Sequence, residues 1–198
     1  MFLCITVDVE DSQYPWKNGN QLKSLIWGDL PGYEGTFGIP KIIDICKAYG
    51  LKATFFVDIF EYKTYGEDQI KEVIFYILEN DHDVQLHIHP KRLTGSSDNL
   101  WEYPREKQME IIRRGKEVLT GWTGLSPIAH RAGAYGINAD TIRALKVNSI
   151  PVDSSMFYGH ENCKVTWSHN KVVEREEILE VPITIFLRRS ALRLWGLT

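Results

Sequence analysis

Short runs of β-branched and aromatic residues alternate with helix-like segments along most of this 198-residue chain. Phe2–Val9 and Ala53–Val57 have the composition typical of strands. Ile39–Tyr49 has apolar residues at helical spacing, with Pro40 in its first turn and Gly50 at its end. Because strands that alternate with helices form βαβ units, we expect an α/β fold with a parallel sheet or barrel.

The rest of the chain continues this alternation, and we expect one domain over residues 1–198. The further helices that we expect are Glu67–Asn80, Arg105–Leu119 and a helix capped by Asn138 that ends near Lys146. The further strands that we expect are Val84–His89, Pro127–His130, Ile150–Val152, Val165–Val173 and Ile178–Leu187.

The charge and the apolar patterning exclude several functional classes. With 26 acidic and 23 basic residues, the chain has a formal net charge of −3, which argues against a basic nucleic-acid-binding protein. No apolar run approaches the roughly 18 residues of a membrane-spanning helix, so we expect no transmembrane segment. The first residues lack a basic region and a small-residue cleavage site, which favours a cytoplasmic protein. The three cysteines, Cys4, Cys46 and Cys163, have neither a disulfide-framework nor a zinc-finger spacing.

Polar side chains lie at the carboxyl ends of five expected strands. These residues are Asp8, Asp58, His87 with His89, Arg131 and Asp153. In parallel α/β folds, the carboxyl ends of the strands form the edge where active sites are assembled. We therefore expect these side chains to meet in one site.

His87 and His89 stand two residues apart on an expected strand. Residues at this spacing point to the same side, so the two imidazoles could bind one metal ion. The alternative is a pair of histidines on a solvated edge, or one structural histidine bonded to the backbone.

Asp8 and Glu10 have the same spacing at the end of the first expected strand. One carboxylate could bind a metal ion while its neighbour acts as a general base. The alternative is a solvated acidic turn. A carboxylate pair and a histidine pair at the same edge of one sheet favour the metal site.

Arg131 precedes a glycine-bearing loop, residues 132–136. An arginine at this place could pair with a carboxylate and orient it. The backbone N–H groups of the loop could donate to a developing oxyanion. The alternative is a surface turn with an arginine on its rim.

Two long loops, residues 12–37 and the segment after His89, carry the aromatic residues Trp16, Trp27, Trp101 and Tyr103. Loops of this length inside a compact domain are more often functional than idle. The rings could stack on sugar rings, or they could pack the loops against the core.

Five segments together resemble the polysaccharide deacetylase superfamily, the NodB-homology proteins of carbohydrate esterase family 4. They are Thr6–Asp11, Lys52–Val57, His82–Pro90, Arg131–Gly136 and Asp153–Ser155, and their order and spacing match over about residues 3–185. The resemblance implies a distorted (β/α) barrel with about seven parallel strands and a divalent metal at its carboxyl face, in a chain that could be truncated at its C-terminal end. It also implies an enzyme that removes acetyl groups from N-acetylated sugars by amide hydrolysis.

The resemblance implies a metal site built from one acidic residue and two histidines. Glu10 is the implied acidic ligand, since it shares a face with Asp8, which the resemblance implies to be the base. Asp11 is the alternative ligand. His87 matches the first metal histidine of the family, and His89 would be the second if the strand stays extended through Ile88. Mixed histidine and carboxylate ligation favours zinc, with cobalt, nickel and manganese as alternatives.

The resemblance also implies roles for four other residues. Asp8 would be the catalytic base, and Arg131 would orient it. The backbone after Arg131, near Tyr135, would help to bind the oxyanion. Asp153 matches a motif that supports the surroundings of the arginine.

The chain departs from the family pattern at three places. Val9 stands where the family has its usual second acidic residue, and Lys91 stands where the second metal histidine is usual. The last motif of the family provides a histidine as general acid, whereas this chain has only His160 and His169 after Asp153. Two alternatives therefore stay open: a metal-independent hydrolase of amide C–N bonds on the same fold, and a catalytically inactive carbohydrate-binding relative. The leading expectation is a deacetylase with a carbohydrate substrate as its partner.

Overall fold

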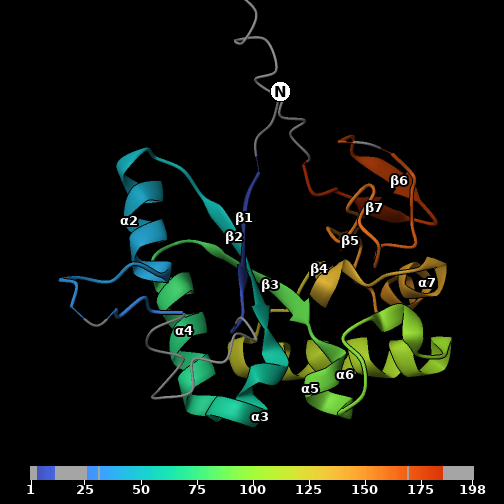
Figure 1. Cartoon of the computed structure of the whole chain (residues 1–198), viewed down its shortest axis with the longest axis horizontal. Helices are drawn as coiled ribbons and strands as arrows, with labels where there is room; N and C mark the ends of the chain where they lie inside the picture. Colours follow the sequence, from blue (N-terminus) through green and yellow to red (C-terminus); the bar gives the residue numbers. More distant parts are fainter. Residues whose placement is uncertain (1–3, 12–25, 31, 169, 185–198) are drawn as a thin grey trace, which may run out of the picture.

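The computed structural model of the chain describes residues 4–11, 26–30, 32–168 and 170–184. Its centre is a seven-stranded sheet in the order β1-β2-β3-β4-β5-β7-β6 (Figure 1). The strands are β1 (Ile5–Val9), β2 (Ala53–Asp58), β3 (Asp83–Ile88), β4 (Ala129–Ala132), β5 (Val152–Asp153), β6 (Val173–Arg175) and β7 (Ile178–Glu180). β1 and β6 stand at the two ends of this order, and the described residues do not pair them into a closed barrel.

The strands are mostly parallel, and the exception is β6, which pairs with β7 in the antiparallel direction. The two residues between them, Glu176 and Glu177, have φ of 51° and 65°. Two consecutive positive φ values are typical of the type I′ turns that join tight hairpins. The expected α/β fold with about seven strands is confirmed, and this hairpin makes one of them antiparallel.

The strand that we expected at Val165–Val173 is wrong except for its last residue. Residues 165–168 and 170–172 form no helix or strand. Val165 is nevertheless buried, and Trp167 packs against the same core. The apolar residues of this segment therefore reflect the packing of an irregular loop.

Helices connect the strands and pack against the sheet (Figure 1). The α-helices are α2 (Ile39–Ala48), α3 (Tyr62–Tyr65), α4 (Glu67–Glu79), α5 (Pro90–Thr94), α6 (Arg105–Thr123) and α7 (Ala139–Val147). Short 3₁₀ turns are η1 (Ile59–Glu61), η2 (Leu100–Glu102) and η3 (Gly133–Tyr135). The helices predicted from the sequence are confirmed as α2, α4, α6 and α7. Among the described residues, no helix combines the length and the apolar character needed to cross a membrane.

Asn138 caps the amino end of α7, as the sequence predicts. Its Oδ1 accepts a hydrogen bond from Thr141 N at 3.0 Å, and Asn138 N donates to Thr141 Oγ1 at 3.1 Å. Such a cap is worth about 1 kcal/mol. Because two residues separate the glycine-bearing loop from α7, this cap also helps to fix where the loop ends.

The core lies between the sheet and its helices. Phe55, Leu86 and Ile88 from the middle strands are fully buried, and the register of β2 and β3 places all three on one face of the sheet. Gly115 allows α6 to approach β3 closely, because a Cβ there would lie 3.1 Å from Ile88 and 3.2 Å from Leu86. This packing holds the middle strands, and with them their carboxyl ends, in fixed positions.

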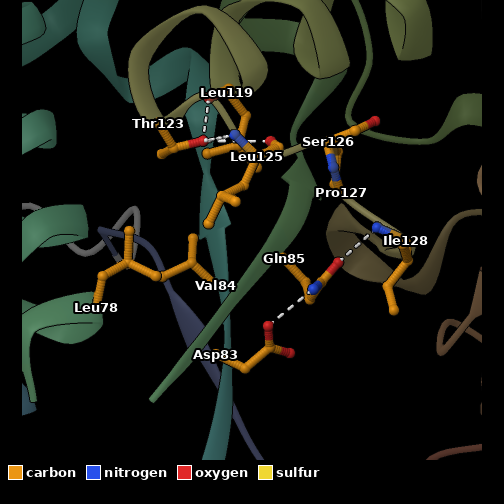
Figure 2. A pocket seen from close by; sticks show the side chains of 10 residues that line it. All are labelled: Leu78, Asp83, Val84, Gln85, Leu119, Thr123, Leu125, Ser126, Pro127 and Ile128. Atoms are coloured by element: carbon orange, nitrogen blue, oxygen red, sulfur yellow. Dashed lines mark hydrogen bonds between the residues drawn. The ribbon is translucent and has the colours of Figure 1, made fainter. Parts of the chain in front are cut away.

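A hollow of about 220 Å³ lies at the amino ends of β3 and β4. Within it, Gln85 Nε2 donates to Asp83 Oδ1 at 2.9 Å, and Gln85 Oε1 accepts from Ile128 N at 2.9 Å (Figure 2). Gln85 thereby ties the starts of two neighbouring strands together. The hollow lies at the opposite ends of the strands from the polar residues singled out in the sequence.

Candidate active site

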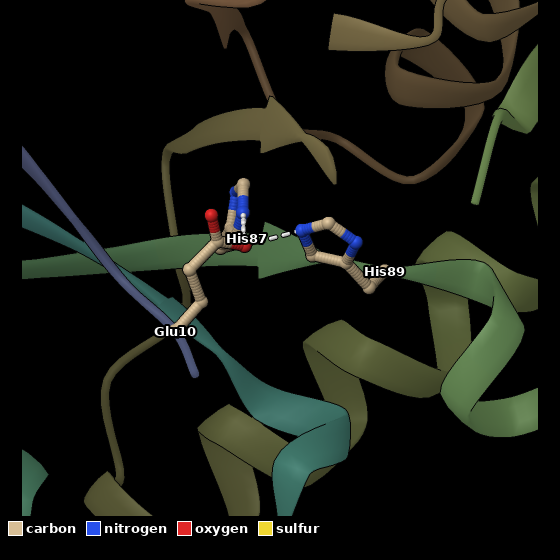
Figure 3. A group of neighbouring side chains, drawn as sticks. All are labelled: Glu10, His87 and His89. Atoms are coloured by element: carbon tan, nitrogen blue, oxygen red, sulfur yellow. Dashed lines mark hydrogen bonds and ion pairs between the residues drawn. The ribbon is translucent and has the colours of Figure 1, made fainter. Parts of the chain in front are cut away.

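Three residues expected to bind metal meet at the carboxyl edge of the sheet (Figure 3). Glu10 directly follows β1, His87 lies in β3, and His89 follows the end of that strand. One ligand atom from each of the three side chains lies within 4.8 Å of the other two. The structure therefore brings together the carboxylate and the two histidines that the sequence spacing singled out.

The hydrogen bonds of His87 leave a lone pair facing Glu10. His87 Nδ1 lies 2.9 Å from the carbonyl oxygen of Arg131, which can only accept, so Nδ1 carries a proton. In the neutral ring Nε2 then has a lone pair, and it lies 3.1 Å from Glu10 Oε2. Two lone pairs that face each other need a proton or a cation between them.

His89 has a similar arrangement. Its Nδ1 lies 3.1 Å from Asp98 Oδ1, and its Nε2 contacts Glu10 Oε2. Burial alone would lower the pKa of His89, but hydrogen bonds with Asp98 and Glu10 outweigh burial and raise the pKa to about 10. A proton on this ring is one way to balance the carboxylates, and a bound cation is another.

Glu10 is the anionic member of the group. Burial alone would raise its pKa, but the close contacts with the imidazoles of His87 and His89 hold the pKa well below its usual range. An ionised carboxylate and two imidazole nitrogens are ligand types that zinc and related divalent ions bind. The donor set therefore fits a divalent cation.

The sequence left open which acid, Glu10 or Asp11, faces His87, and whether His89 lies beside it. β3 stays extended up to His89, so His89 points to the same side as His87. Lys91 lies exposed in α5, and Asp11 contacts Arg92 and other residues away from the histidines. The structure thus places the side chains of positions 10 and 89, rather than those of positions 11 and 91, in the candidate metal site.

Arg131 holds Asp8 beside this group. Arg131 Nη1 donates to Asp8 Oδ1 at 2.6 Å. The other donors of the guanidinium reach Ser154 O at 2.9 Å, Ser154 Oγ at 2.8 Å and Thr6 Oγ1 at 3.0 Å. Its Cζ atom also lies 4.2 Å from the centre of the Phe56 ring. These contacts fix the arginine, which bonds to Asp8 through Oδ1.

The Asp153 side chain forms hydrogen bonds with His130 and Ser155 and not with Arg131. It is fully buried, and its Oδ1 accepts from His130 Nδ1 at 2.8 Å and from Ser155 Oγ at 2.8 Å. The next residue, Ser154, is the one that binds Arg131. Asp153 therefore fixes the turn that carries Ser154, and its connection to the arginine is indirect.

Glu180, at the end of β7, is a buried acid that the sequence analysis did not single out. Its Oε1 accepts from Met156 N at 3.0 Å, while its Oε2 is buried without a donor among the described residues and has the Asp153 carboxylate as a neighbour. Two carboxylates can share a hydrogen bond only when one of them is protonated. Burial and the charge of Asp153 raise the pKa of Glu180 far above its usual range. Its position at a strand end was the signal that could have identified it.

The glycine-bearing loop forms a strained turn after Arg131. Ala134 and Tyr135 have φ of 50° and 56°, a region that residues with a Cβ seldom occupy. Gly136 packs against the neighbouring loop so closely that a Cβ there would lie 2.7 Å from Asn99 Cα. Strain of this kind clusters at functional sites, because the surrounding contacts must maintain it.

The aromatic residues of the two long loops make packing contacts. Trp27 packs edge-on against a ring of α4, with the centroids 5.1 Å apart. Lys164 Nζ lies 4.6 Å from the centre of the Trp101 ring, and Tyr103 Oη bonds to the backbone of its own loop. These contacts favour the packing interpretation, while Trp16 lies outside the described residues.

A different group of rings lies beside the strained turn. Tyr135 packs edge-on against Phe157 at 5.1 Å and against His160 at 5.3 Å. Phe157 and His160 are stacked, with their centroids 5.0 Å apart. All three side chains are half-buried. His169, the other histidine late in the chain, lies outside the described part of the structure.

Asp58, the remaining polar strand end, anchors α5. Its Oδ2 accepts from Arg92 Nε at 2.8 Å, and Arg92 Nη2 donates to Glu61 Oε1 at 3.0 Å. Burial raises the pKa of Asp58, and burial together with the Asp58 charge raises the pKa of Glu61 to about 8. Because α5 directly follows His89, this network fixes the chain just beyond the candidate metal site.

These contacts define a site with two chemical parts. Glu10, His87 and His89 can hold a divalent cation, and Asp8 is a carboxylate with one oxygen fixed by Arg131. Such an arrangement suits the activation of water for attack on an amide or ester carbonyl. The fold and the site together have the features of a hydrolase built at the carboxyl edge of a parallel α/β sheet.

Comparison with known proteins identifies the family. Residues 21–151 match the family model for polysaccharide deacetylase, so the chain belongs to the polysaccharide deacetylase family. This match confirms the resemblance drawn from the five sequence segments. A search of the curated proteins finds no significant match.

Solved structures with a similar fold come from the same family. A protein from Mycobacterium smegmatis classed as a polysaccharide deacetylase aligns with a TM-score of 0.62 at 19% identity, over 95% of this chain and 63% of that chain. A family 4 carbohydrate esterase from Streptomyces lividans in complex with acetate gives 0.51 at 15% identity, over 77% and 61% of the two chains. A CE4 family pseudoenzyme from Bacillus anthracis gives 0.50 at 13% identity, over 76% and 41%. These relatives share the fold, and this chain spans less than two thirds of their length.

Proposed function

We propose that this chain is a metal-dependent hydrolase that removes acetyl groups from N-acetylated sugars or polysaccharides. The observation that carries the proposal is the convergence of Glu10, His87 and His89 beside a carboxylate held by a buried arginine. Membership of the polysaccharide deacetylase family supports the same reaction. The relative from Streptomyces lividans is in complex with acetate, which is the product that this reaction would release.

Glu10, His87 and His89 would hold the metal ion, with zinc favoured and cobalt, nickel or manganese as alternatives. When bound, a divalent ion polarises the amide carbonyl and lowers the pKa of a coordinated water. The two histidines present Nε2 because their Nδ1 atoms face a backbone carbonyl and the Asp98 carboxylate. Such outer partners orient metal-binding histidines.

Asp8 would act as the general base. Arg131 occupies Oδ1, so Oδ2 would take the proton from the attacking water. Because Arg131 is only 3% exposed and also binds Ser154 and Thr6, it orients the Asp8 carboxylate rigidly. Because Asp8 is not one of the three proposed metal ligands, a mutation of Asp8 should reduce turnover without removing the metal ion.

The turn after Arg131 would stabilise the oxyanion. The backbone N–H of Tyr135 is the donor that we assign, and one such donor contributes about 3 kcal/mol to transition-state stabilisation. The positive φ values of Ala134 and Tyr135 give this turn its shape. The half-buried rings of Tyr135 and Phe157 would provide an apolar surface for the carbohydrate substrate.

Acetate release from oligomers of N-acetylglucosamine tests the proposal. The chain loaded with Zn²⁺ or Co²⁺ should release acetate, and Asp8→Asn should slow turnover by at least about 10²-fold while binding the same amount of metal. Asp44→Asn, an exposed change on α2, is the matched control and should keep full turnover. No acetate from any N-acetylated saccharide, or full turnover by Asp8→Asn, would contradict the proposal.

A catalytically inactive carbohydrate-binding relative is the second candidate. The observation in its favour is that His160, the one histidine after Asp153 within the described residues, is engaged in stacking with Phe157. This candidate would bind metal and oligosaccharide without releasing acetate. A metal-independent amide hydrolase would instead keep its turnover after the metal is removed with a chelator.

A further inference from the structure

We propose that Asp98 and Gly133 together hold His89 in the position of a metal ligand, so that metal affinity depends on two residues outside the ligand set. This inference rests on the proposed function. His89 follows the end of β3 and precedes the first residue of α5, so its extended backbone sets the side that it faces but not the rotation of its ring. Its orientation must therefore come from tertiary contacts.

Asp98 provides the first of these contacts. Its Oδ1 lies 3.1 Å from His89 Nδ1, and the side chains of His89 and Asp98 are only 13% and 20% exposed. A carboxylate at Nδ1 keeps the proton on that atom and directs the Nε2 lone pair toward Glu10. This is the role that carboxylates play behind histidines in many metal sites.

The loop that carries Asp98 is itself fixed. Tyr103 Oη accepts from Ser97 N at 2.8 Å and donates to Ser97 O at 2.8 Å, so both polar groups of the preceding residue are bound. Gly95 ends α5 with a φ of 75°, a left-handed conformation that favours glycine. The carboxylate of Asp98 is therefore presented from a defined position.

Gly133 provides the second contact, on the His89 ring itself. A Cβ at position 133 would lie 2.6–2.7 Å from three ring atoms of His89, which is closer than real Cβ atoms come to other groups. Only glycine leaves room for the ring where it lies. Gly133 belongs to the loop that follows Arg131, so the loop has a second function besides its backbone donors.

Metal titration of the purified full chain tests the inference. The protein is stripped with a chelator and titrated with Co²⁺, with absorption bands of bound cobalt as one readout and competition with a chromophoric chelator for the affinity. Asp98→Ala should weaken Co²⁺ binding by about 10–100-fold, the usual effect of losing such an outer partner. Gly133→Ala should also weaken it and alter the cobalt spectrum. Asp68→Ala, an exposed change on α4, is the control and should bind like the wild type.

A double-mutant cycle separates positioning from a general effect on the fold. If Asp98 acts through His89, then Asp98→Ala should cause no further loss of affinity in a His89→Ala background. The same factor in both backgrounds would overturn the inference. If Asp98→Ala does not fold by circular dichroism, Asp98→Asn replaces it, and wild-type affinity in that variant would overturn the inference equally.

The outcomes also distinguish the inference from the function on which it rests. A wild type that binds Co²⁺ and releases acetate, with Asp98→Ala within twofold of its affinity, would overturn the inference alone. A wild type that binds no Co²⁺ would overturn the metal-dependent function and the inference together.

Discussion

Glu180→Gln should change how the stability of this protein depends on pH. Glutamine mimics a protonated glutamate: its amide oxygen can accept from Met156 N, and its amide nitrogen can donate to Asp153, as a protonated acid can. The variant therefore keeps the buried hydrogen bonds and removes only the titrating proton.

The magnitude follows from the difference in pKa between the folded and unfolded chains. A glutamate in the unfolded chain has a pKa of about 4.3, whereas burial and the charge of Asp153 keep Glu180 protonated in the folded chain. Above the unfolded pKa, the folded state binds one proton more than the unfolded state, so stability falls as pH rises. The slope from this one group is about 1.4 kcal/mol per pH unit, which sets a ceiling of about 4 kcal/mol between pH 5 and pH 8. Asp153, whose pKa is lowered mainly by hydrogen bonds that outweigh its burial, stays ionised over this range and adds no slope.

Urea unfolding of the wild type and of Glu180→Gln at several values between pH 5 and pH 8 measures this difference. The stability of the variant relative to the wild type should increase steadily with pH, because the variant lacks the proton that the wild type must keep. Glu174→Gln, an exposed change on β6, is the matched control and should follow the wild-type curve.

The difference in the free energy of unfolding between Glu180→Gln and the wild type should therefore change with pH. A difference that changes by less than about 0.5 kcal/mol between pH 5 and pH 8 would refute the reasoning. Such a result would mean that Glu180 has the same protonation in the folded and unfolded chains. The burial of two neighbouring carboxyl groups would then need a different explanation.

Three further changes test other parts of the structure. Arg131→Lys cannot reproduce the fork of hydrogen bonds that orients Asp8, so kcat for acetate release should fall by about 10²-fold in steady-state assays, and an unchanged kcat would contradict the assigned geometry. Asn138→Ala removes the cap of α7 and should lower the free energy of unfolding by about 1 kcal/mol in urea titrations, whereas no loss would show that the cap is dispensable. Gly136→Ala would place a Cβ 2.7 Å from Asn99 Cα and should destabilise the protein by about 1–3 kcal/mol in thermal unfolding, and a stable variant would mean that this loop moves easily.

The local pattern of the sequence predicted most of the regular structure. The four main helices and the alternation with strands follow from periodicity and end signals, such as the cap at Asn138. The segment at Val165 shows the limit of such patterns, because burial in an irregular loop and burial in a strand select the same apolar residues. The antiparallel β6 was equally hidden, since the turn at Glu176 and Glu177 lacks the usual asparagine or glycine.

The candidate site was predictable to the extent that it depends on strand geometry. Strand periodicity placed His87 and His89 on one side, and the parallel topology placed Glu10 and Asp8 at the same edge. The roles themselves were implied by the family resemblance, and they stay predictions until activity and metal binding are measured.

Local sequence patterns were enough to predict the α/β class, the family and the edge of the sheet where the polar residues gather, because these depend on spacings within single segments. Tertiary packing sets which acid faces the histidines, brings Asp98 and Gly133 against His89, and buries Glu180 beside Asp153. Arg131 and Asp8 are 123 residues apart in the chain, yet Arg131 Nη1 lies 2.6 Å from Asp8 Oδ1. No local pattern encodes such a contact, since β2 and β3 lie between β1 and β4 and the two side chains meet only once the sheet has formed.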